Sequence, residues 1–402
     1  MEMPEYNKHV KVRLATNDDI PEAERIAVKA FNANLLGAYK PDTTLVVEGP
    51  EGNIVAAMII TPDPMWWGTA SIPAAAVGGV ATDPTQQKKG YAGAMMIGAV
   101  HHYREHGWAV SPLWPFSFAY YRKFGWELPQ RDWVIRAWPD MLRGLPGSAS
   151  GVRTANKDDL EGLVSTYSRA AQRTNAQTNR SQTNWDNRVR EESSGERSFF
   201  DQCLIHTDKK GSVDGYALYG MHSRDRSQGQ DMTVRELIGD TLGTQLSLLH
   251  ACADVPNVIS VSITLPVDSP IPDLFPDYVN IESAQRLMLR VLDISTALTE
   301  LHPPKGEKGV VSFQVRDWIV SEKHPIEITA EFDNGEVYVS PSARSDAIQC
   351  DIAAFSRLFS GGMNVERGRL LGVIEGGSAQ ADAASDALLF GRAPFRSELE
   401  PG

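Results

Sequence analysis

Residues 77–96 constrain the fold of this chain more than any other stretch. The segment opens with small and β-branched residues that predict the end of a buried strand, and Asp83-Pro84 stops that strand because proline offers no ladder donor. Lys88-Lys89-Gly90 then opens a helix. A strand, a short basic loop and a helix N-terminus together predict an anion site, because free backbone N–H groups and the positive end of the helix dipole suit a phosphate.

A near-repeat predicts a duplicated domain. Residues 152–160 echo residues 12–20, with the same expected strand, helix cap and helix start. Chance similarity is the alternative, because helix-cap signals are generic. The second copy has a helix-like run at residues 242–253 but no basic glycine loop before it, so we expect that copy to lack the phosphate-binding feature.

The hydrophobic pattern predicts two kinds of architecture along the chain. Residues 10–137 alternate strands and helices as a mixed α/β sandwich does, and residues 142–151 predict a linker. The character changes near Ser283, where residues 286–298 predict an amphipathic helix and Asn334-Gly335 a hairpin turn. We therefore expect a third, α+β part at the C-terminal end.

Composition excludes several classes of protein. The chain has 402 residues and a formal charge of −12, which argues against a nucleic-acid-binding protein and is compatible with cationic substrates. The N-terminus lacks a signal peptide's apolar core, and no apolar run approaches the length of a membrane span. Three widely spaced cysteines match no disulfide or zinc pattern, so we expect a cytoplasmic protein without membrane association.

No metal is expected. His102 and His106 have the spacing of a helical metal pair, but the sequence offers no clear third ligand, and a solvated helix face is the simpler interpretation.

Two motifs point to a family. Gln87-Lys88-Lys89-Gly90-Tyr91-Ala92 resembles the pyrophosphate-binding signature of the GNAT superfamily of N-acetyltransferases. About thirty residues further on, residues 115–126 resemble the tyrosine-bearing helix of the Eis (enhanced intracellular survival) acetyltransferases, and the ending at residues 392–395 is also similar. The resemblance implies an α/β (α+β) fold with two tandem GNAT-like mixed α/β domains, residues 1–145 (catalytic) and 146–284 (degenerate), followed by a sterol-carrier-protein-like α+β domain at 285–402.

The resemblance also implies site residues for acetyl-CoA. Tyr121 would be the general acid that protonates the CoA thiolate, with Tyr120 as its rival and plain packing of both rings as the alternative. The thioester and pantetheine arm would lie on the backbone of Val80, Ala81 and Thr82. The residues expected to hold the pyrophosphate are Gln87, Lys88, Lys89, Gly90, Tyr91 and Ala92.

The sequence leaves several candidates for the general base. The family uses its C-terminal carboxylate, which would be that of Gly402 here, but the usual terminal aromatic residue is missing. Glu398 or Glu400 could substitute, or the tail could be uninvolved.

The expected function is acetyl-CoA-dependent N-acetyltransfer to a primary amine by direct transfer in a ternary complex. By family resemblance the acceptor is an aminoglycoside-like polyamine or a lysine side chain, and the protein is a homo-oligomer, a hexamer. The alternative is a non-catalytic protein that binds acyl-CoA, or an apolar ligand in the third domain.

Overall fold

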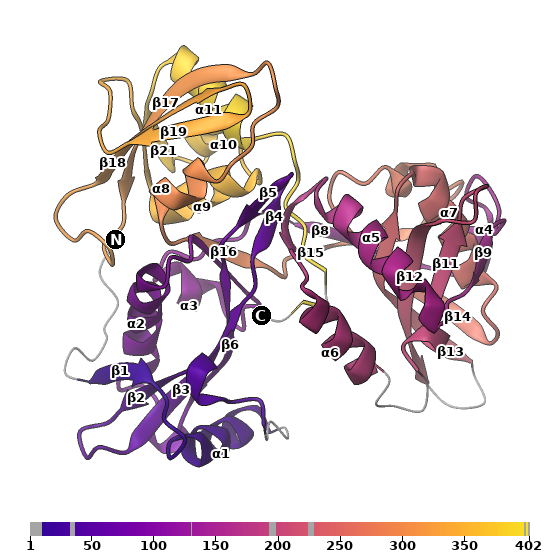
Figure 1. Cartoon of the computed structure of the whole chain (residues 1–402), viewed down its shortest axis with the longest axis horizontal. Helices are drawn as coiled ribbons and strands as arrows, with labels where there is room; N and C mark the ends of the chain where they lie inside the picture. The colour runs from indigo at the N-terminus through magenta and orange to yellow at the C-terminus, as the bar shows by residue number, and fades with distance from the viewer. Residues whose placement is uncertain are drawn as a thin grey trace.

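The computed structural model describes residues 10–32, 37–129, 131–192, 198–223, 229–397 and 399–400. The chain forms three lobes (Figure 1), coloured indigo to purple, magenta to pink, and orange to yellow in chain order. Among the helices of these residues, none combines the length and the apolarity needed to cross a membrane.

The first lobe contains a six-stranded sheet in the order β1-β2-β3-β6-β7-β16. Alternate residues of the strands face opposite sides, so Val46 and Ala57 pack toward α1 while Val47 and Ala56 pack toward α2. The elements are β1 (Lys11–Leu14), α1 (Ile20–Phe31), β2 (Thr44–Glu48), β3 (Ile54–Pro62), β6 (Ala75–Thr82), α2 (Tyr91–Glu105), β7 (Val110–Leu113), α3 (Phe118–Arg122) and β16 (Met288–Val291).

The second lobe contains a seven-stranded sheet in the order β15-β8-β14-β13-β12-β11-β9. Its strands are β8 (Asp132–Ala137), β9 (Val152–Thr154), β11 (Cys203–Thr207), β12 (Val213–Ser223), β13 (Gln230–Gly239), β14 (Val258–Leu265) and β15 (Asn280–Ala284). Its helices are α4 (Pro139–Arg143), α5 (Leu160–Ala171), α6 (Gln182–Glu192) and α7 (Leu242–Ala253).

The third lobe is a five-stranded sheet, β19-β18-β17-β20-β21, with helices packed on it. The strands are β17 (Lys308–Arg316), β18 (Ile326–Asp333), β19 (Glu336–Ser340), β20 (Ile348–Asp351) and β21 (Ile374–Gly376). The helices are α8 (Ile294–Thr299), α9 (Ile352–Ser360), α10 (Val365–Leu370) and α11 (Ala379–Leu389). A small sheet of β10 (Asn175–Thr178), β4 (Met65–Trp67) and β5 (Ala70–Ile72) connects the first two lobes.

The predicted duplication is visible in individual contacts. Arg13 of β1 pairs with Asp19, whose carboxylate also accepts from the Thr16 backbone N–H at 2.7 Å. In the second lobe Arg153 pairs with Asp159, and that carboxylate accepts from the Asn156 backbone N–H at 2.8 Å. The same arginine, loop and aspartate therefore begin the first helix of both lobes.

Strands exchange between the lobes across the domain limits that the sequence predicts, residues 145/146 and 284/285. Strand β8 precedes residue 145, yet it pairs with β14 and β15 in the second sheet. Strand β16 follows residue 285, yet it pairs with β7 in the first sheet. The lobes are thus interlocked by their own chain.

The helix predicted for residues 286–298 is wrong in its first half. Residues 288–291 form strand β16, and only residues 294–299 form a helix, α8. All four residues of β16 are buried, Arg290 among them, so the strand lacks the alternation of a half-exposed strand. A short strand that is buried on both faces cannot be told from a buried helix by periodicity.

Candidate active site

Strands β6 and β7 separate shortly after they meet. Their parallel ladder contains the single pair Val77 and Leu113, supplemented by an isolated bridge between Ala74 and Val110. Strand β6 continues to Thr82, and along residues 78–82 no strand of the described chain pairs with the edge that faces away from β3. That edge offers backbone groups to an extended ligand, in the manner of an added strand.

A β-bulge lies where the strands separate. Gly79 and Val80 of β6 together oppose Met58 of β3, because Ala81 pairs with Ala57 and Gly78 with Ile59. Bulges of this kind redirect the backbone of a strand. Gly79 has a φ of +56°, and a Cβ there would lie 2.8 Å from the hydroxyl of Tyr39, so both conformation and space require glycine.

Tyr39 holds the bulge in place. Its side chain is buried, and its hydroxyl donates a hydrogen bond of 2.6 Å to the carbonyl oxygen of Gly79. Sequence reasoning did not identify Tyr39, since no local pattern links a tyrosine before β2 to a carbonyl forty residues later.

The loop after β6 is fixed by an acidic residue. The Asp83 carboxylate accepts hydrogen bonds from the hydroxyl (2.7 Å) and backbone N–H (2.9 Å) of Thr85, and Arg25 of α1 donates to it at 2.7 Å. The Thr85 hydroxyl and the Arg25 guanidinium lower the pKa of Asp83 to about 2. Asp83 is therefore an anionic anchor for the loop.

The predicted anion site lies between this anchor and α2. Lys88 and Gly90 both have positive φ, +62° and +80°, which turns the chain into the helix. Gly90 is the N-cap of α2 and supplies no side-chain hydrogen bond to the first turn. Lys88 and Lys89 are exposed beside it, with Lys89 donating to the Gln86 side chain at 2.8 Å. Uncapped amides and two lysines suit a phosphate.

Tyr121 lies in the same buried cluster as Val77, Leu113 and the first helical residue of α2, Tyr91. Ser117 caps the short helix α3 by accepting from the Tyr120 N–H, and the Tyr121 side chain is only 3% exposed. Burial raises the pKa of Tyr121 to about 12, so the phenol keeps its proton at neutral pH. The neutral phenol is the form of Tyr121 that has a proton to donate.

Tyr120, the alternative candidate for the general acid, lies next to Tyr121 on α3. Its ring centroid is 5.2 Å from that of Tyr121, and burial raises the pKa of its phenol too. The Tyr120 hydroxyl is buried and has no hydrogen-bond partner among the described residues.

The end of α3 is clamped by residues that sequence reasoning missed. The guanidinium of Arg290, fully buried on β16, donates to the Phe124 carbonyl at 2.6 Å and to the Asp317 carboxylate at 2.6 Å. Trp318 donates to the Lys123 carbonyl at 3.2 Å. Gly125 makes this possible, because a Cβ there would lie 1.8 Å from a guanidinium nitrogen of Arg290.

The tail reaches the same region, but Glu400 is a poor candidate for the base. Its carboxylate is buried and accepts from Arg180 at 2.7 Å, while its backbone carbonyl accepts from Trp114, between β7 and α3, at 2.9 Å. Burial alone would raise the pKa of this carboxyl, but Arg180, Arg188 and Arg396 outweigh it and lower the pKa. Such a carboxylate is an anchor for the tail.

Two other candidates for the general base, Glu398 and Gly402, lie outside the described residues.

A cavity of about 460 Å³ lies next to Trp114 and is lined also by Pro115, Gln285, Arg286 and Glu400.

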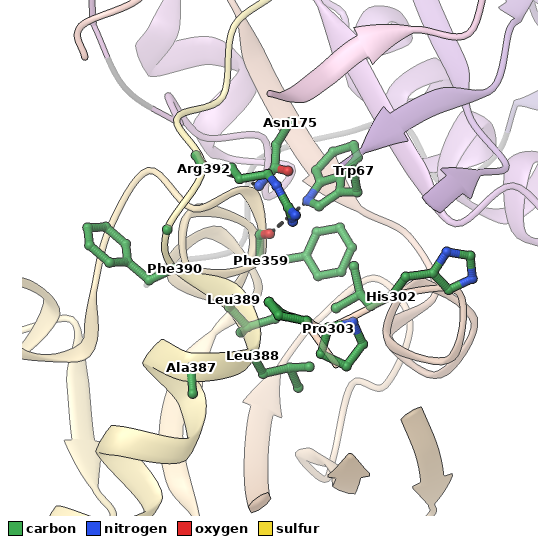
Figure 2. Close-up of a pocket in the computed structure, with 13 residues that line it drawn as sticks. Trp67, Asn175, His302, Pro303, Phe359, Ala387, Leu388, Leu389, Phe390 and Arg392 are labelled. Carbon is green, nitrogen blue, oxygen red and sulfur yellow. Dashed lines mark hydrogen bonds between the residues drawn. The ribbon is translucent and has the colours of Figure 1, made fainter. Parts of the chain in front are cut away.

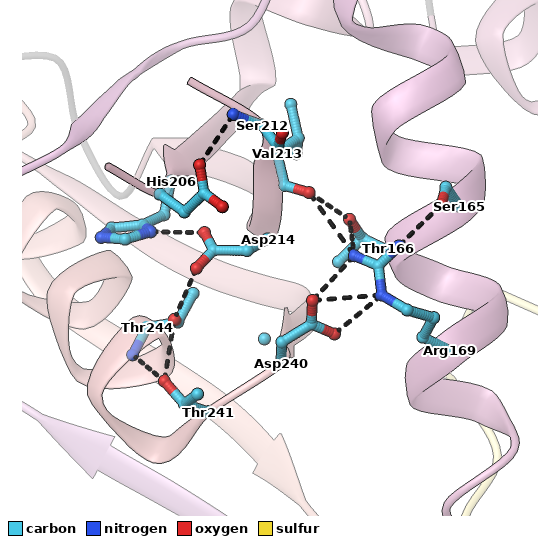
Figure 3. Close-up of polar contacts among 12 residues, drawn as sticks. Ser165, Thr166, Arg169, His206, Ser212, Val213, Asp214, Asp240, Thr241 and Thr244 are labelled. Atoms are coloured by element: carbon cyan, nitrogen blue, oxygen red, sulfur yellow. Dashed lines mark hydrogen bonds and ion pairs between the residues drawn. The ribbon is translucent and has the colours of Figure 1, made fainter. Parts of the chain in front are cut away.

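Among the described residues of the second lobe, no comparable loop joins β13 to α7. Two residues, 240 and 241, separate β13 from α7, whereas eight residues, 83–90, separate β6 from α2. Thr241 caps α7 by accepting from the Thr244 N–H at 3.1 Å (Figure 3). The nearby Asp214 accepts from Thr244 and His206, and Asp240 pairs with Arg169, so the polar groups satisfy one another.

Comparisons with known proteins identify two acetyltransferase domains in the chain. Residues 11–128 match a family model described as an acetyltransferase (GNAT) domain, and residues 176–291 match a second model with the same description. An uncharacterized N-acetyltransferase from Streptomyces griseus is 24% identical over 347 residues, which cover 82% of each chain.

Several solved structures share the fold over nearly the whole chain. A GCN5-related N-acetyltransferase from Anabaena variabilis superposes with a TM-score of 0.83 at 19% identity, covering 96% of this chain and 99% of that one. A probable N-acyltransferase from Enterococcus faecalis gives 0.81 at 17% identity, with coverage of 97% and 100%. Eis1 from Mycobacterium abscessus gives 0.76 at 20% identity, with coverage of 96% and 99%.

Proposed function

We propose that this chain, an acetyltransferase with two GNAT domains, carries an acetyl group from acetyl-CoA to a primary amine in its first lobe. One observation supports this most. The unpaired edge of β6 leads into the basic loop and α2, and Tyr121 belongs to the buried cluster that contains Val77 and Leu113, the pair after which β6 and β7 separate. The second lobe lacks the loop, so the proposal assigns one catalytic site to each chain.

The residues present fit acetyl-CoA, whose thioester supplies the activated acetyl group. The pyrophosphate would bind the amides and lysines of residues 87–92, and the backbone of Val80, Ala81 and Thr82 would hold the pantetheine arm and polarise the thioester carbonyl. The amine nitrogen forms a bond to the carbonyl carbon, the carbon–sulfur bond breaks, and Tyr121 gives its proton to the departing sulfur. Direct transfer in a ternary complex needs no covalent enzyme intermediate.

The acceptor we propose is an aminoglycoside-like polyamine or a lysine side chain. The net charge of −12 supports a cationic acceptor, because an acidic protein attracts amines. With the Glu400 carboxylate paired with Arg180 and Arg188, the base that we propose for the amine proton is the Gly402 carboxylate or, as the alternative, Glu398.

We also propose an Eis-like organisation, with a sterol-carrier-protein-like third lobe and a hexameric assembly in the cytoplasm. The shared fold with Eis1 over 96% of the chain supports the organisation. Three free, buried cysteines are compatible with a reducing compartment.

The test measures release of the CoA thiol when the purified chain is mixed with acetyl-CoA and a panel of polyamines and lysine peptides. Replacing Tyr121 with phenylalanine should lower kcat about a hundredfold or more and leave the KM for acetyl-CoA unchanged, because a general acid acts in the transition state. Tyr120→Phe, one residue away on the same helix, is the matched control and should retain activity. Equal activity of wild type and Tyr121→Phe would remove Tyr121 from the mechanism, and CoA binding without thiol release for any amine would overturn the proposed reaction.

A further inference from the structure

A small cavity lies where all three lobes meet, away from the residues of the candidate active site (Figure 2). Its volume is about 180 Å³. Trp67 comes from β4, Asn175 from β10, Phe359 from the end of α9, and Leu388 and Arg392 from α11 and the segment that follows it.

The walls of this cavity combine apolar side chains with polar groups, and some of those polar groups are hydrogen-bonded within the protein. Trp67 donates its indole N–H to the Phe359 carbonyl at 2.9 Å, and the two ring centroids lie 5.0 Å apart. The Asn175 amide is engaged by the Ser360 carbonyl at 2.9 Å and the Arg392 carbonyl at 3.3 Å. The side-chain donors of Trp67 and Asn175 are thus already used within the protein.

Arg392 differs from these groups. Its guanidinium makes no hydrogen bond or ion pair with any residue that the structure describes, although the side chain is half-buried. It packs so closely on Gly68 that a Cβ there would lie 2.5 Å from a guanidinium nitrogen. The cavity lining includes His302 and no aspartate or glutamate, in a chain whose net charge is −12.

A carboxylate matches the planar fork of a guanidinium with two parallel hydrogen bonds, and Arg392 has no such partner among the described residues. A dry apolar cavity of about 150 Å³ is large enough to bind benzene. The observed cavity therefore has room for one aromatic ring beside its cationic wall.

We propose that this cavity binds a small aromatic carboxylate, with the carboxylate on Arg392 and the ring against the apolar side chains of the lining, which include Phe359 and Leu388. The site shares no residue with the residues assigned to acetyl-CoA, so it is independent of the proposed acetyl transfer. Because its walls come from three lobes, an occupant would hold the lobes together where the C-terminal segment begins.

Benzoate is the probe, and benzamide, of the same shape without charge, is its control. Isothermal titration of the full chain should show saturable benzoate binding that is about tenfold or more tighter than benzamide binding. Arg392→Gln should reduce benzoate affinity to the level of benzamide, whereas Arg190→Gln, on exposed α6, should leave it unchanged. No saturable benzoate binding up to about 10 mM, or equal affinity in wild type and Arg392→Gln, would overturn the proposal.

A second measurement does not depend on a variant. Phenylglyoxal modifies accessible arginines, and peptide mass spectrometry reports each site separately. Saturating benzoate should slow modification of Arg392 about fivefold or more and leave Arg190 unaffected, because a bound ligand blocks only its own site. Equal rates at Arg392 with and without benzoate would contradict the assignment.

Discussion

The clamp on α3 allows a prediction with a definite magnitude. Asp317→Asn keeps the size of the side chain and removes one charge from the pair with Arg290, both of which are at most 2% exposed. Breaking a buried ion pair from one side costs about 3–5 kcal/mol, because the other charge stays buried without compensation. For a cooperative unit of about 150–250 residues this lowers the melting temperature by about 6–20 °C.

The same change should affect catalysis. The Arg290 guanidinium also holds the Phe124 carbonyl, three residues after Tyr121, so a loosened guanidinium lets the phenol move. A displacement of about 1 Å costs about a hundredfold in rate. We expect kcat to fall while the KM for acetyl-CoA stays the same, because the hydrogen bonds of the clamp go to the end of α3 and not to the residues assigned to the cofactor.

Calorimetry and the thiol-release assay measure both effects, with Arg122→Gln as the matched control. Arg122 lies on α3, the helix that carries Tyr121, and pairs with Glu127 at 2.8 Å. Its side chain is 46% exposed, so losing this ion pair should lower the free energy of unfolding by less than about 1 kcal/mol. The double variant Arg290→Met, Asp317→Leu removes both charges and should recover stability without recovering kcat. A melting temperature of Asp317→Asn within about 2 °C of wild type would refute the reasoning.

Three further perturbations address the bulge, the loop and the tail. Gly79→Ala should destabilise the chain by about 2 kcal/mol or more, since it adds a positive-φ penalty to a clash with Tyr39; Gly52→Ala, with φ +78° and open space, isolates the φ penalty in thermal unfolding. The pKa of Asp83 is lowered to about 2, so the contribution of this carboxylate to stability is present above its ordinary pKa and is lost as pH falls toward 2. The melting temperature should therefore fall less steeply between pH 5 and 2 in Asp83→Asn than in wild type. Identical pH dependence of the two melting temperatures would count against Asp83 as an anchor of the loop. Glu400→Gln should weaken the attachment of the C-terminal tail to Arg180 and so speed proteolytic cleavage after residue 390. An unchanged cleavage rate would show that the ion pair does not hold the tail.

Features encoded by neighbouring residues could be predicted from the sequence. The helix expected after the basic loop is observed as α2. The positive φ of Gly90, the proline stop after Asp83 and the repeated helix start at Asn156 follow from backbone chemistry within a few residues. These local rules were enough to predict a mixed α/β fold, a duplication and a phosphate site in the first copy.

The contacts that complete the site depend on tertiary structure. Arg290 meets Phe124 across 166 positions of sequence, and Arg180 meets Glu400 across 220. No periodicity relates such residues, and the exchange of β8 and β16 between the sheets leaves no local trace, because the residue pattern of a strand does not specify which strand it pairs with. The sequence alone thus determined local features such as α2 and the loop before it, whereas packing between distant segments decided where β16 pairs, how α3 is clamped, where Glu400 is anchored and where an unpaired arginine faces a cavity.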